Sequence, residues 1–157
     1  MVEEKSKKIR FIYLERSFYL PARTRLKLFI LELFKKEGAD VEKVNYLFCS
    51  DRYLLSINRG FLQHDTYTDI ITFQYTPPNE AVESDIYISV DRVRENAKAF
   101  KVPFQVELYR VAFHGALHLC GYKDKSAKEG REMRAKEDYY VSLYVSRETN
   151  RRRRSHI

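Results

Sequence analysis

The fold is decided by residues 69–89, which read DIITFQYTPPNEAVESDIYIS. Residues 69–75 are rich in β-branched and aromatic side chains, which favour a strand, and Pro77-Pro78 ends it. A second strand is expected at 85–89, directly after the first. Two consecutive strands followed by helices argue against a strictly alternating doubly wound fold. The stretch therefore predicts an α/β (α+β) domain with a small mixed sheet.

Two further strands are expected at 9–14 and 44–48, which makes about four. About five helices are expected, at 21–38, 51–57, 91–100, 103–121 and from 126 onward. Several carry typical helix signals. The first has its apolar residues at helical spacing, Asp91 is expected to cap the third, and Ser126-Ala-Lys-Glu129 matches a capping box for the last.

Length and charge point to one domain. The chain has 157 residues, and its 29 basic and 22 acidic side chains give a net charge of +7. No apolar stretch approaches the ~20 residues that span a bilayer, and no secretory signal is evident. The two cysteines form no CxxC motif, and no phosphate-binding glycine loop is present. We expect a soluble, cytoplasmic protein without a membrane partner.

Four of the positive charges lie together, at Arg151 to Arg154. We therefore divide the chain into a domain at 1–146 and a basic C-terminal tail at 147–157. Such a run is commonly a solvated tail, but it also suits an arm that contacts phosphates. This charge is compatible with a nucleic-acid partner, but charge alone does not indicate which polyanion the protein binds.

The chemistry is concentrated in residues 113–124, FHGALHLCGYKD. His114 and His118 are four residues apart on a predicted helix, so both imidazoles reach one point in space. Gly115 costs helix stability, which indicates that its missing side chain is needed there. Gly121 is placed to end the helix and to return Asp124 to the histidines. Three protein ligands with a fourth position open are typical of a catalytic zinc site, with one Zn²⁺ per chain.

The same donor set also suits nickel, cobalt, iron or manganese, so the sequence does not fix the metal. A zinc peptidase of the HExxHxxGxxH type is disfavoured, because Gly115 stands where that chemistry requires a glutamate.

The run His-Gly-x-Leu-His-Leu-x-Gly-Tyr resembles the signature of the YbeY family of metal-dependent endoribonucleases. Residues 58–73, the segment 84–89, Met133 and Glu137 are also similar to that family. The resemblance implies a single α/β domain, one zinc ion and cleavage of single-stranded RNA. It further implies a role at the small ribosomal subunit, in maturation of the 3′ end of 16S rRNA and in ribosome quality control.

Three positions depart from the family pattern. Asp124 replaces the third histidine, and a carboxylate is a legitimate zinc ligand. Leu62 stands where the family has an arginine, and Arg59, one turn earlier, is our candidate to replace its phosphate contact. Ser84 replaces a glycine before Asp85.

Candidate RNA-binding residues are Arg59, Arg110 and Lys123, and the sequence names no general base. Asp69 and Asp85 are weaker candidates for a base or a metal partner, and hydrogen bonding to nearby backbone amides explains them equally well. We interpret His64 and His156 as solvated. The alternative to a nuclease is a metal-stabilised RNA-binding or ribosome-assembly factor with little catalysis.

Overall fold

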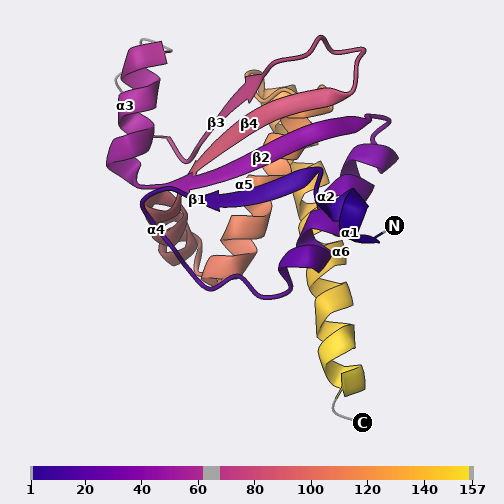
Figure 1. Ribbon diagram of the computed structural model, residues 1–157. Coiled ribbons are helices and arrows are strands. Elements are labelled where there is room, and N and C mark those ends of the chain that lie inside the picture. Colours follow the sequence, from indigo (N-terminus) through magenta and orange to yellow (C-terminus); the bar gives the residue numbers. More distant parts are fainter. Residues whose placement is uncertain (1, 62–67, 156–157) are drawn as a thin grey trace.

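Four strands form one mixed sheet in the order β1-β2-β4-β3 (Figure 1). The computed structural model describes residues 2–61 and 68–155 of the chain. Strands β1, β2 and β4 run parallel to one another, whereas β3 pairs antiparallel with β4 and forms an edge of the sheet. Their bounds are β1 (Ile9–Tyr13), β2 (Val41–Cys49), β3 (Ile70–Gln74) and β4 (Val82–Ser89).

Helices cover the two faces of the sheet unequally. Helices α2 and α5 lie on one face, α6 packs against α5, and α3 packs on the other face where β3 and β4 pair (Figure 1). In the described ranges the helices are α1 (Val2–Ser6), α2 (Arg23–Lys36), α3 (Asp51–Phe61), α4 (Val90–Phe100), α5 (Phe104–Leu119) and α6 (Ala127–Ser155).

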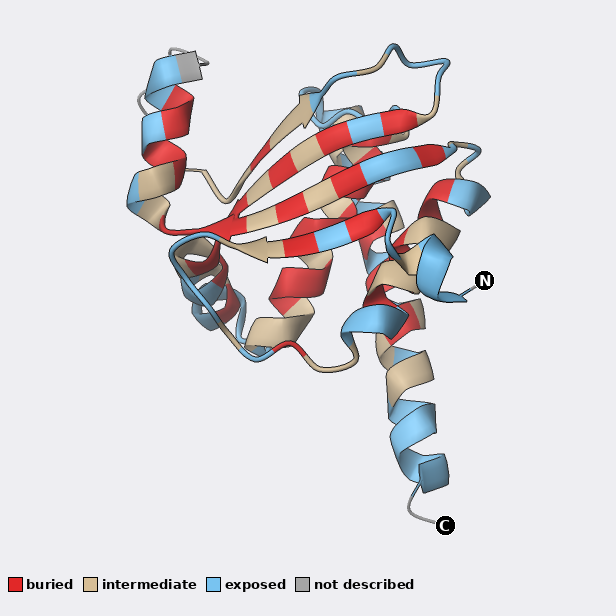
Figure 2. Cartoon of the chain, in the orientation of Figure 1, coloured by how far each residue is buried: buried red, intermediate tan, exposed pale blue. Residues whose placement is uncertain are grey.

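The alternation of side chains along the strands decides which residues reach the core. In β4, Ile86 and Ile88 are fully buried towards the helices, whereas Asp85 and Tyr87, which alternate with them, are half-buried on the opposite face. Figure 2 shows this alternation of buried and less buried residues along β1, β2 and β4. The covered face therefore holds the main core, and a smaller apolar cluster lies beneath α3.

The predicted α+β class, the mixed sheet and the four strands are confirmed. The sequence missed the short helix α1, and β2 and β4 begin three residues earlier than expected, at Val41 and Val82. The cap predicted at Asp91 is wrong. Ser89 caps α4 by accepting from the amide of Arg92 at 3.1 Å, which leaves Asp91 to accept from the amide of Asp51 at 2.9 Å.

The segment set apart as a basic tail continues α6 as a helix to Ser155. Glu148 binds Arg25 of α2 with two hydrogen bonds of 2.9 Å, and Arg147 binds Glu32 of α2 at 2.9 Å. Beyond these contacts, residues 149–155 are exposed, and this end of α6 extends away from the rest of the chain (Figure 2). No helix in the described ranges is both long and apolar enough to cross a membrane.

Candidate metal centre

Helix α5 brings the two histidines to one place. His114 and His118 lie one turn apart with ring centroids 4.5 Å apart. Gly115 between them faces the sheet, where an added Cβ would lie 2.9 Å from Ile70 Cδ1 and 3.2 Å from Ile86 Cγ2. The glycine therefore lets α5 approach the sheet closely.

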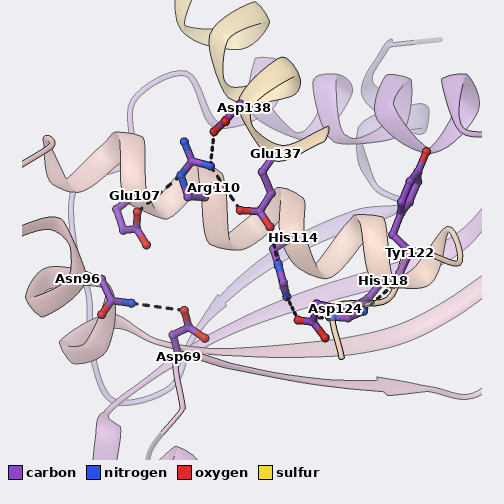
Figure 3. A network of polar contacts seen from close by, with 10 residues as sticks. All are labelled: Asp69, Asn96, Glu107, Arg110, His114, His118, Tyr122, Asp124, Glu137 and Asp138. Atoms are coloured by element: carbon purple, nitrogen blue, oxygen red, sulfur yellow. Dashed lines mark hydrogen bonds and ion pairs between the residues drawn. The ribbon is translucent and has the colours of Figure 1, made fainter. Parts of the chain in front are cut away.

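The third residue of the cluster returns through a turn that a glycine makes possible. Helix α5 ends at Leu119, and Gly121 adopts φ +103°, which L side chains rarely adopt. The chain then reverses and places Asp124 Oδ2 at 3.3 Å from His114 Nε2 and 3.4 Å from His118 Nε2 (Figure 3). Asp124 thus lies beside the two histidines, as expected from the turn at Gly121.

These distances suit a tetrahedral ion. Two ligand atoms each about 2.0–2.1 Å from such an ion lie about 3.3 Å apart. The ligand atoms of His114, His118 and Asp124 all lie within 4.8 Å of one another, and the structure describes no other such group. The site therefore offers two nitrogens and one carboxylate oxygen, with room for a further ligand.

The far nitrogen of each ring has an oxygen partner. His114 Nδ1 lies 2.7 Å from Glu137 Oε2, and His118 Nδ1 lies 2.9 Å from the carbonyl oxygen of Tyr122. A carbonyl oxygen only accepts, so Nδ1 of His118 carries the proton, and the lone pair of the neutral ring is on Nε2. Both rings are thus oriented as in protein metal sites, where the second nitrogen donates to an oxygen.

A network of charged side chains surrounds His114 (Figure 3). Burial lowers the pKa of His114, but the hydrogen bond to Glu137 and the charge of nearby carboxylates outweigh it and raise the pKa. Arg110 donates to Asp138 at 2.7 Å and to Glu137 at 3.4 Å. Glu137 is thereby held between a histidine and an arginine.

The cluster opens onto a cavity of about 770 Å³. Its walls come from α3, from α5 and the turn that follows it, and from β3 with the two residues before it. Besides the three cluster residues, its lining includes Asn58, Thr68, Asp69, Thr72, Gln74 and Lys125. The edge strand thus forms one wall, and Lys125 adds a cation to the lining.

The predicted phosphate-binding residues lie in different surroundings. Arg59 and Lys123 are exposed neighbours of the lining residues Asn58 and Asp124, although neither lines the cavity within the described residues. Arg110 is half-buried, and its guanidinium is paired with carboxylates.

The two weaker aspartate candidates lie on opposite faces of the sheet. Asp69 lines the cavity, and burial raises the pKa of its carboxyl group. Asp85 lies on the other face, where it accepts from Asn45 and from the Tyr75 hydroxyl, both at 2.9 Å. The idea that Asp85 faces the metal site is therefore wrong. Leu62, His64 and His156 lie outside the described residues.

Sequence reasoning gave no role to Glu137, Lys125 or the carbonyl of Tyr122. The spacing of Met133 and Glu137, both buried on one face of α6, was a signal that this glutamate points inward. Nothing in the sequence indicates which histidine it meets.

This geometry defines a class of protein. It is a small α+β domain in which two histidines and one aspartate cluster beside the edge strand. The family model described as "Endoribonuclease YbeY" matches residues 19–144. The chain belongs to the YbeY endoribonuclease family.

Individual relatives agree over most of the chain. A protein named "Endoribonuclease YbeY" from Cytophaga hutchinsonii is 46% identical over 139 residues, which are 88% of this chain and 97% of the relative. One of the same name from Flavobacterium psychrophilum is 54% identical over 115 residues, covering 73% and 79%. A solution structure from Thermotoga maritima is similar with a TM-score of 0.64 and 31% identity, over 89% of this chain and 93% of that one.

Proposed function

We propose that this protein is a zinc-dependent endoribonuclease acting on single-stranded RNA, with His114, His118 and Asp124 as ligands of one Zn²⁺ per chain. The observation that carries the proposal is the convergence of the two Nε2 atoms and one carboxylate oxygen on an open cavity. Membership of an endoribonuclease family supports RNA as the substrate.

A bound zinc ion supplies Lewis acidity to the scissile phosphodiester and its attacking nucleophile. The protein itself orients the ligands of this ion. Glu137 and the carbonyl of Tyr122 hold the imidazoles with Nε2 towards the ion.

Cations around the opening attract and orient the RNA backbone. Lys125 lines the cavity, and Arg59 and Lys123 stand beside lining residues. We assign Arg110 a contact with phosphate only where RNA displaces Asp138, because that carboxylate is its exposed partner.

The family resemblance extends the proposal to a cellular role. We infer that the substrate is rRNA of the small subunit, that cleavage serves maturation of the 3′ end of 16S rRNA and ribosome quality control, and that the protein acts in the cytoplasm.

The test compares Asp124→Ala with Asp85→Ala, a matched change of an aspartate on the opposite face of the sheet. We expect about one zinc per chain in the wild type and in Asp85→Ala by mass spectrometry, and a sharp loss in Asp124→Ala. Cleavage of unstructured RNA should follow the metal content.

Two results would contradict the proposal. Unchanged metal in Asp124→Ala removes this residue from the ligand set. Full metal content without cleavage, together with RNA affinity that survives His114→Ala, favours the RNA-binding factor over the nuclease.

A further inference from the structure

A second, smaller cavity adjoins the metal cluster and lies between α4, α5 and α6. Its volume is about 270 Å³, and it shares Asp69, His114 and Asp124 with the large cavity. Because His114 and Asp124 line both cavities, a molecule bound at the metal cluster would lie next to this second cavity.

The wall from α5 contains a buried carboxyl group with an unused oxygen. Glu107 is only 3% exposed, and none of the described residues donates a hydrogen bond to its Oε1. Arg110 Nε lies 3.9 Å from this oxygen, which is within ion-pair range but too far for a hydrogen bond. Burial raises the pKa of Glu107 to about 7. Oε1 thus lacks a hydrogen-bond donor among the described residues.

The opposite wall adds further acceptors. Asn96 donates to Asp69 Oδ2 through a long hydrogen bond of 3.4 Å. The amide oxygen of Asn96 and the carboxylate of Asp69 add acceptors to the lining of this cavity. Figure 3 shows the carboxyl group of Glu107 on the side of α5 that faces this pair. The cavity therefore suits a ligand with several N–H donors.

An aromatic ring lies at the edge of the same cavity. Phe100, at the end of α4, lines it and is 61% exposed. Exposed aromatic rings next to a nucleic-acid site provide a face on which an unpaired base stacks.

From this arrangement we propose that the cavity is a guanine-binding subsite, in which Glu107 accepts from the base edge and Phe100 stacks on its face. The inference rests on the proposed function, since it assigns the base next to the phosphate held at the metal cluster.

The edge chemistry of the four bases selects guanine. Guanine presents two adjacent N–H donors, N1–H and the N2 amino group, which match the two oxygens of the Glu107 carboxylate once it is ionised, above its pKa of about 7. Uracil has a single N–H between two acceptors, and adenine and cytosine each place an acceptor beside their amino group. These three bases leave an oxygen of Glu107 unpaired or face it with another acceptor, and an unpaired buried group is costly.

The experiment uses mononucleotides, which contain no phosphodiester bond to cleave. Guanosine, adenosine, cytidine and uridine 5′-monophosphates and ribose 5-phosphate are titrated into the zinc-loaded full chain and followed by NMR. We expect the guanosine nucleotide to bind about tenfold more tightly than the uridine nucleotide, from the paired edge contacts. Ribose 5-phosphate should bind more weakly than any nucleotide.

Two variants and one control locate the effect. Glu107→Gln keeps the side-chain volume and should reduce the guanosine preference to less than about threefold. Phe100→Ala should weaken all four nucleotides about tenfold and leave ribose 5-phosphate unchanged. Tyr19→Ala, an exposed aromatic residue outside both cavities, should change nothing.

The proposal is overturned if the four nucleotides bind alike, if ribose 5-phosphate binds as tightly as they do, or if the preference survives in Glu107→Gln. A guanosine preference in a protein that cleaves no RNA would retain the subsite and reject the nuclease. Cleavage of RNA without a guanosine preference would retain the nuclease and reject the subsite.

Discussion

The two histidines of α5 are one turn apart, yet they are held by different kinds of partner. His114 meets the carboxylate of Glu137, which Arg110 also binds, so its orientation depends on charged side chains from α6. His118 meets the backbone carbonyl of Tyr122, so its orientation depends on the path of the chain through the turn. The first arrangement is sensitive to charge and pH, and the second to backbone conformation.

The largest effect expected on the His114 side is on stability as a function of pH. Glu107 faces Arg110, Asp69, Glu137 and Arg134, and its pKa is raised from 4.5 to about 7 by burial. Between these two values the folded state retains a proton that the unfolded state has lost. The free energy of unfolding should therefore fall as pH rises through this range, by at most about 3 kcal/mol.

Glu107→Gln removes this dependence. In urea titrations of the metal-free protein, the variant should match the wild type at pH 4 and exceed its stability at pH 8. Equal differences at the two pH values would show that Glu107 ionises normally in the folded protein.

Glu137→Gln tests the charge on the His114 side directly. The amide fills the same space but removes the negative charge from His114 Nδ1. We expect zinc affinity to fall about 10–100-fold, as for other partners of ligating histidines. Competition with a chromogenic chelator measures it, and Glu132→Gln, an exposed change on the same helix, is the control.

If Glu137→Gln changes the zinc affinity by less than twofold, the charge of Glu137 does not matter for zinc binding by His114. The charged partner of His114 would then contribute no more to zinc binding than a neutral one.

On the His118 side the corresponding change is to the backbone. Gly121→Ala meets no atom within 4 Å, so its cost is conformational and arises from φ +103°. We expect a loss of about 1–2 kcal/mol in the free energy of unfolding. Gly60→Ala, also in open space but inside α3, should instead stabilise the protein by about 0.5–1 kcal/mol. Thermal unfolding of both variants checks the signs, and a stable Gly121→Ala would refute the strained turn.

The smallest effect is expected for Tyr122→Phe. The Tyr122 hydroxyl donates to Glu37 at 2.7 Å, whereas its backbone carbonyl faces His118. The variant should lose about 1 kcal/mol of stability from that hydrogen bond. Zinc affinity, read by the same chelator competition, should stay within about threefold. A larger loss would mean that the side chain, and not the backbone alone, orients His118.

Local sequence patterns predicted the part of the site whose residues are close to one another along the chain. The spacing of His114 and His118, the contact made by Gly115 and the turn at Gly121 all follow from helix geometry and glycine chemistry. The alternation of Ile86 and Ile88 with Asp85 also contained the information that this aspartate faces away from the site.

The remainder depends on packing between distant segments. Glu137 lies 23 residues after His114 and meets it only because α6 packs along α5. The buried carboxyl group of Glu107 is likewise invisible in sequence, since helix periodicity indicates that it faces inward but does not show whether a donor lies opposite.

The unbroken course of α6 also fixes a distance. Glu137 lies beside the candidate metal cluster, and the exposed arginines end at Arg154 on the same helix. At 1.5 Å per residue, about 26 Å separates them along the axis. A flexible tail would let any polyanion bound by these arginines range over a wide volume. Because α6 is a helix, this distance is instead fixed. An RNA strand bound both by these arginines and at the metal cluster would therefore have a set length of chain between the two points.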